Sequence, residues 1–199
     1  MRLQAELLRW GQGSQGEAVT EPSADLLISP PIAELRPGER QVFRVALRGA
    51  RPAPEELAYR LILEDIAEPV LAAGDSGSMV NFRMRYDLPV LVAPVGKVVN
   101  ALHWKPCSPE AASMPAKPAA AEACVHLSNA GNRRVKIQTL MLTGDGWQQV
   151  LSLKNGENML SGTQRDWRVP LQPGQSGPLR GVEVKTTGGE TLQAQAGGV

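Results

Sequence analysis

The sequence predicts an all-β fold built as two β-sandwich domains. Apolar residues alternate with polar ones at a period of two, 20 Gly and 16 Pro separate the apolar runs, and the runs recur at roughly ten-residue spacing. A chain of 199 residues is long enough for two domains of about 100 residues. We place the boundary at the turn Pro94-Val95-Gly96-Lys97, so that the domains span 1–94 and 95–199.

In the first domain, Leu3, Ala5 and Leu7 alternate with polar residues, so the chain opens inside a strand. Because Glu6 and Arg9 interrupt any apolar signal segment, we expect an export signal and the first strands of this domain to lie upstream, which would leave the domain incomplete. The turn GQGSQGE follows. Further strands are expected at 26–31, 32–35, 41–47 and 57–66, and a polar loop at 68–78.

The longest alternating stretch is 80–94, VNFRMRYDLPVLVAP. Its even positions from Val80 to Val92 are all apolar, which predicts one strand of thirteen residues. The simpler interpretation is a core strand of the sandwich. The alternative is that part of its apolar face is offered to a partner by edge pairing.

The second domain begins with a strand at 98–104, followed by the Pro- and Ala-rich loop CSPEAASMPAKPAAAEAC. Turns are expected at 129–132, 144–146, 154–156 and 172–174. Short strands are expected at 124–128, 135–142, 150–153, 166–169 and 179–184, with a weak last strand near the C-terminus.

Charge and motifs exclude several function classes. With 21 basic and 20 acidic residues, no overall field favours nucleic acid or an anionic membrane, and no apolar run is long enough for membrane insertion. The sequence holds no Gly-rich phosphate loop, nucleophile elbow or metalloprotease motif, so we predict neither an enzyme nor a cofactor.

Cys107 and Cys124 fit one disulfide in an oxidising compartment, or two free thiols. With His103 and His126 they could also supply four zinc ligands. The disulfide is favoured over zinc because a proline separates His103 from Cys107 and the loop between the cysteines is long and plain. No metal site is therefore predicted.

Two further groups have both a structural and a functional interpretation. The tryptophans lie within or beside expected strands, which favours core positions over ligand platforms: Trp10, Trp104, Trp147 and Trp167. Arg83 and Arg85 most simply form the solvated side of the long strand. Alternatively, one guanidinium binds a partner's carboxylate.

The order of several blocks resembles the periplasmic pilus-assembly chaperones of chaperone-usher systems. In the first domain these blocks are ISPP at 28–31, LRPGERQVFRV at 35–45, EELAYRLILEDI at 55–66 and LPVLVAP at 88–94. LLRW and RYDLPV are most similar to the archaic, spore-coat-U-like branch, as are CVHLSNAGNRRVKI and MLSGTQRDWRV in the second domain.

This resemblance implies two immunoglobulin-like domains without enzymatic activity, in the periplasm, with pilin subunits and an outer-membrane usher as partners. It also implies that the long strand is lent to a pilin lacking its own last strand, with Val80, Phe82, Met84 and Tyr86 at the donor positions. Self-association is a further expectation when no subunit is bound. The rival hypothesis is a non-catalytic adhesion or structural module whose long strand is only core.

The sequence departs from the family at the carboxylate anchor, where the family uses two basic residues. One of them lies on a first strand that we do not find, and the other position falls near Pro89. Arg83 and Arg85 therefore remain the candidate anchors.

Overall fold

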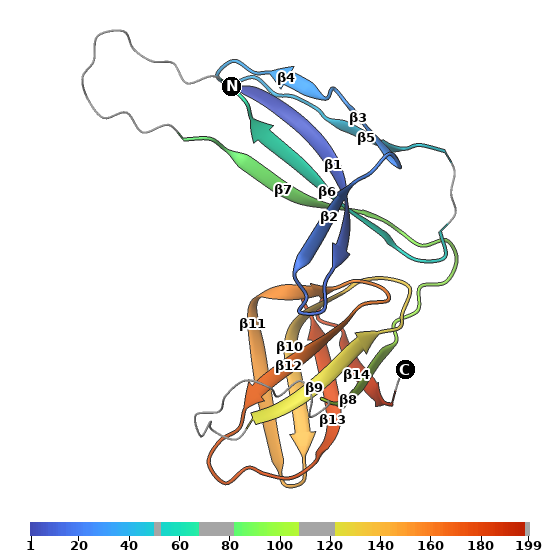
Figure 1. The fold of residues 1–199 in the computed structure, drawn as a ribbon, viewed down its shortest axis with the longest axis vertical. Coiled ribbons are helices and arrows are strands. Elements are labelled where there is room, and N and C mark those ends of the chain that lie inside the picture. The colour runs from blue at the N-terminus through green and yellow to red at the C-terminus, as the bar shows by residue number, and fades with distance from the viewer. Residues whose placement is uncertain (50–52, 68–81, 108–121, 198–199) are drawn as a thin grey trace, which may run out of the picture. The chain divides into compact units, whose positions relative to one another are not determined.

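The structure, a computed structural model, describes residues 1–49, 53–67, 82–107 and 122–197. All regular elements among them are β-strands, which confirms the all-β prediction (Figure 1). No helix in the described part of the chain is long and apolar enough to cross a membrane. Within this fold the chain divides into two compact units.

The first unit comprises Met1–Trp10, Thr20–Pro52 and Ala58–Val92. Its strands are β1 (Arg2–Gln12), β2 (Ala18–Pro22), β3 (Leu26–Ser29), β4 (Ile32–Glu34), β5 (Arg44–Leu47), β6 (Leu57–Asp65) and β7 (Arg85–Val92). The end of β1 from Gly11, the start of β2 up to Val19 and Leu57 of β6 are grouped with the second unit. One sheet has the order β2-β1-β6-β7 with β4 also paired to β1, and β3 pairs β5 in a separate two-stranded sheet.

The alternation in β1 builds the core of this first unit. Leu3, Ala5 and Leu7 are buried as predicted, because every second side chain of the strand points to the same face. Antiparallel pairing of β1 with β6 runs from Leu3 opposite Asp65 to Arg9 opposite Tyr59. Tyr59, only 1% exposed, donates its hydroxyl to Asp25 Oδ2 at 3.2 Å. Because Tyr59 lies opposite Arg9, its side chain is on the same face as Leu3, Ala5 and Leu7, and its hydrogen bond ties β6 to the residue before β3.

The second unit contains one seven-stranded sheet in the order β11-β10-β13-β14-β8-β9-β12. Its strands are β8 (Leu102–Pro106), β9 (Glu122–Asn129), β10 (Val135–Gly144), β11 (Trp147–Met159), β12 (Gln164–Pro170), β13 (Leu179–Thr186) and β14 (Thr191–Ala196). In Figure 1 the orange strands β10 and β11 lie behind the yellow β9 and the orange β12. Side chains from β8 to β13 share one buried core, so this single sheet folds over on itself.

All four tryptophans are 5–6% exposed, which confirms their predicted core positions. Trp104, Trp147 and Trp167 belong to the core of the second unit. Trp10 lies in the first unit, where the guanidinium carbon of Arg60 is 3.8 Å from its ring centroid. This distance is typical of a cation–π contact.

Several secondary-structure predictions need correction. β2 was missed, because all five of its residues are exposed and it therefore has no apolar alternation. The turn predicted at 154–156 is instead a bulge inside β11, whose residues 153–156 lie between Ser152 opposite Thr139 and Glu157 opposite Ile137. The strand predicted from Val98 begins at Leu102, and the long strand begins at Arg85 within the described residues.

Candidate functional site

The long alternating strand lies at the edge of its sheet. β7 is the last strand in the order β2-β1-β6-β7, so among the described strands only β6 pairs with it. Met84, just before β7, accepts a hydrogen bond from the Asp65 N–H at 2.9 Å, which carries the pairing one residue beyond the strand's first residue. An edge strand leaves one row of backbone N–H and C=O groups unpaired.

The apolar row of this strand is exposed over its N-terminal half. Phe82 is 86% exposed, and Met84, Tyr86 and Leu88 are each 43–45% exposed. From Val90 to Val92 the side chains become half-buried. We call Phe82, Met84, Tyr86 and Leu88 the apolar row of β7. The interpretation of the whole stretch as a core strand is therefore wrong for this half, while Val80 lies outside the described residues.

Charged side chains occupy the alternate positions and tie β7 to β6. Arg60 Nη1 lies 3.3 Å from Asp87 Oδ1, and Arg85 Nη1 lies 3.9 Å from Glu64 Oε2. Arg60 is the better buried of these groups and also covers Trp10, whereas the Arg85–Glu64 pair is exposed on both sides and contributes little. The result is a strand with an apolar face that is largely uncovered and a polar face that is partly paired.

The two candidate anchors differ in their surroundings. Arg83 is exposed, and no ion pair joins it to the described residues. Arg85 already faces Glu64. Strand alternation directs both away from the side that carries Phe82 and Met84.

The predicted cysteine pair is joined as a disulfide. Cys107 and Cys124 have a Cα–Cα distance of 5.4 Å, and the loop 108–121 between them lies outside the described residues. The bond removes the two thiolates that the zinc alternative required. His126 is also engaged, because its Nδ1 lies 2.6 Å from Asp166 Oδ1 and its Nε2 lies 3.3 Å from Gln164 Oε1.

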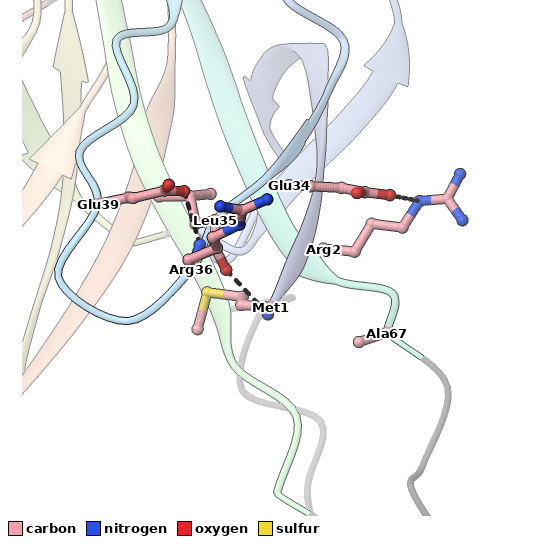
Figure 2. A pocket seen from close by; sticks show the side chains of 7 residues that line it. All are labelled: Met1, Arg2, Glu34, Leu35, Arg36, Glu39 and Ala67. Atoms are coloured by element: carbon pink, nitrogen blue, oxygen red, sulfur yellow. Dashed lines mark hydrogen bonds and ion pairs between the residues drawn. The ribbon is translucent and has the colours of Figure 1, made fainter.

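An open pocket of about 570 Å³ lies in the first unit near the start of β1. Figure 2 shows its lining: Met1, Arg2, Glu34, Leu35, Arg36, Glu39 and Ala67. Its carboxylates have partners within the pocket, with Arg2 Nε 4.0 Å from Glu34 Oε1 and the Arg36 N–H donating to Glu39 Oε2 at 2.8 Å. None of the site residues predicted from sequence lines this pocket.

Comparison with known protein families finds a match over the first domain. Residues 2–97 match the family described as pili and flagellar-assembly chaperone, PapD N-terminal domain. The match covers 96 of the 199 residues, so it is a likeness of the first domain to the N-terminal domain of these chaperones. The family's role is assembly, which is a binding role rather than a catalytic one. A search among curated proteins finds no match.

Solved structures of fimbrial chaperones share the fold over nearly the whole chain. A chain of the CsuC–CsuE chaperone–tip adhesion subunit complex from archaic Csu pili of Acinetobacter baumannii has a TM-score of 0.65 and 16% identity, and the match covers 99% of this chain and 86% of that one. The class 5 fimbriae chaperone CfaA gives 0.65 and 11%, covering 100% and 86%. The Pseudomonas aeruginosa chaperone CupB2 gives 0.51 and 17%, covering 98% and 86%. At these identities the likeness shows the fold, with two immunoglobulin-like β domains.

Sequence reasoning found the apolar row but missed the structural roles of two residues near it, Arg60 and Pro89. Arg60 was treated only as a polar position in its strand, although it contacts both Trp10 and Asp87. Pro89 was considered only as the position where a family anchor would fall. Its signal was present, since a proline inside a strand pattern indicates an edge strand.

Proposed function

We propose that this chain is a pilus-assembly chaperone, which binds and caps incomplete pilin subunits by lending them the apolar row of β7. The observation that carries the proposal is the exposure of that row: four large side chains on the edge strand β7 and the three residues before it, led by Phe82 at 86%. A soluble domain rarely leaves such a row uncovered unless a partner covers it. The likeness of residues 2–97 to the N-terminal domain of pili and flagellar-assembly chaperones supports the class of partner, a subunit of a pilus.

Strand addition uses both the unpaired backbone groups of β7 and its exposed apolar side chains. The unpaired backbone groups of β7 hydrogen-bond to a strand of the subunit, and alternate side chains enter the groove left by the subunit's missing strand. Each large side chain that becomes fully buried contributes roughly 1.5 to 3 kcal/mol before the cost of ordering. Phe82 contributes most of the new burial, because the other three side chains are already half covered.

The proposal also includes Val80, which lies outside the described residues, as a further donor residue, and a carboxylate anchor. Arg83 is the stronger anchor candidate, because Arg85 faces Glu64 and would have to leave it. A guanidinium can bind a subunit's terminal carboxylate in a bidentate manner.

We assign the complete protein to the periplasm and to the archaic branch, with an outer-membrane usher as the second partner. The periplasm is oxidising, which suits the Cys107–Cys124 disulfide. The CsuC–CsuE structure, in which a chaperone holds a tip adhesion subunit, supports this choice of branch and partner. The division into domains 1–94 and 95–199 places β7 at the end of the first domain, next to the switch between compact units at Ala93.

Co-expression with a pilin subunit of a chaperone-usher pilus from the same organism tests the proposal. Wild type should co-purify with the pilin as a one-to-one complex, and the variants Phe82→Asp and Met84→Asp should lose the complex while remaining folded. Unchanged binding by both folded variants would favour the rival hypothesis, a two-domain adhesion or structural module.

A further inference from the structure

The backbone N–H and C=O groups of β7 point alternately toward β6 and toward the open edge of the sheet. Asp65 N–H donates to the carbonyl of Met84, so the N–H and C=O groups of Met84 point toward β6. In an extended strand this direction alternates from residue to residue. The groups of Tyr86, Leu88 and Val90 therefore also point toward β6.

The residues between them present their backbone groups to the open edge. Arg85 and Asp87 each offer an N–H and a C=O there, but Pro89, next in this series, has no N–H. A central strand does not tolerate a missing donor in its ladder, whereas an edge strand does when the gap faces outward. The place of Pro89 within β7 thus agrees with the direction deduced from Met84.

The exposure of the side chains changes at the same point. Phe82 to Pro89 are all exposed, and Val90, Leu91 and Val92 are half-buried. The series of outward-facing backbone donors is therefore interrupted at Pro89, and the uncovered apolar side chains end beside it, although these two properties are independent of each other. Beyond Pro89, a pilin strand would no longer follow the open edge of β7.

We propose that Pro89 ends the docking edge, so that a bound pilin strand hydrogen-bonds to β7 as far as Asp87 and no further. The inference rests on the proposed strand donation and adds its register. The pilin strand pairs with the segment that carries the apolar row, and Pro89 prevents it from sliding toward the C-terminal end of β7. Register matters because a slip of one residue would turn every side chain to the opposite face.

Amide hydrogen exchange, followed by NMR on the labelled chain alone and in complex with the same pilin subunit, tests this limit. In the free chain, the amides of Tyr86 and Leu88 should be protected by β6, and those of Arg85 and Asp87 should exchange quickly. Binding should protect Arg85 and Asp87 and leave Leu91 unchanged. Protection of Leu91 on binding, or fast exchange of Tyr86 in the free chain, would overturn the inference.

The variant Pro89→Ala restores the missing donor. Its new amide should become protected in the complex, and the complex should dissociate about fivefold more slowly, the factor expected for one backbone hydrogen bond of about 1 kcal/mol. Pro94→Ala, outside β7, controls for the general effect of replacing a proline and should leave dissociation unchanged.

The two hypotheses fail in different ways. If Pro89→Ala changes neither protection nor dissociation while Phe82→Asp abolishes the complex, strand donation stands and Pro89 is not its limit. If no β7 amide responds to the pilin and Phe82→Asp still binds, the proposed function itself fails.

Discussion

Replacing Phe82 by alanine should separate binding from folding. In the free chain this side chain is 86% exposed, so its removal should change the free energy of unfolding by no more than about 0.5 kcal/mol. In the complex it would be buried in the subunit groove, where a large apolar side chain contributes roughly 1.5 to 3 kcal/mol. The affinity for pilin should then fall by a factor of about 10 to 150.

The measurement is the dissociation rate of the purified chaperone–pilin complex, since mutations in one interface act mostly on that rate. Val42→Ala is the matched control, because Val42 is 61% exposed in the same unit but lies outside β7. It should leave dissociation within about twofold of wild type, a difference of under 0.5 kcal/mol. Chemical denaturation of each free variant supplies the stability comparison.

Two results would refute the reasoning. A dissociation rate for Phe82→Ala equal to that of the Val42 control would show that the residue does not enter the partner. A loss of more than about 1 kcal/mol in the unfolding free energy of the free variant would show that Phe82 is buried without the pilin.

Three further predictions concern the second unit. Replacing both cysteines of the Cys107–Cys124 bridge by serine should lower the free energy of unfolding by about 3 kcal/mol in urea titrations, because the bridge closes a loop with a sequence separation of 17, and an unchanged midpoint would contradict this. Asn129→Ala should cost about 3 kcal/mol in the same assay, because the buried amide serves three backbone carbonyls and one N–H; a loss below about 0.5 kcal/mol would show that water replaces it. Asp145 Oδ1 accepts a hydrogen bond from Arg180 Nε at 2.8 Å, and this bond lowers the pKa of the Asp145 carboxyl below the ordinary 3.8. Any stability that the pair contributes is therefore present above pH 3.8 and is lost as the pH falls through the lowered pKa. Carboxyl NMR should show the pKa of Asp145 rising toward 3.8 in Arg180→Gln, and an unmoved titration would exclude Arg180 as the cause.

The alternation of apolar and polar residues was enough to locate strands that have one face buried in the core. The strand predicted at 57–66 is β6 (Leu57–Asp65), and in β1 burial selects every second side chain from Leu3 to Leu7. β2 has no buried residue, and a strand of that kind leaves no periodic signal. The bulge in β11 carries Asn and Gly, which also mark turns, so composition could not distinguish the two.

The candidate site shows a different limit of sequence reasoning. A strand that serves its own core and a strand that is kept for a partner carry the same apolar alternation, because each ends up buried on one face. The resemblance suggested which of the two applied to Phe82 and Met84, and the exposure of these side chains supplied the physical observation. The contact of Arg60 with Trp10 depends on β6 lying beside β1, a pairing between distant segments that local patterns do not specify.

The central claim is that β7 is the strand given to the pilin. A crystal structure of the chaperone–pilin complex tests it most directly, through the exposure of Phe82, Met84, Tyr86 and Leu88. The account predicts that Phe82 falls from 86% exposed to buried and that a pilin strand pairs with the open edge of β7. A complex in which the pilin binds elsewhere and Phe82 stays exposed would contradict it.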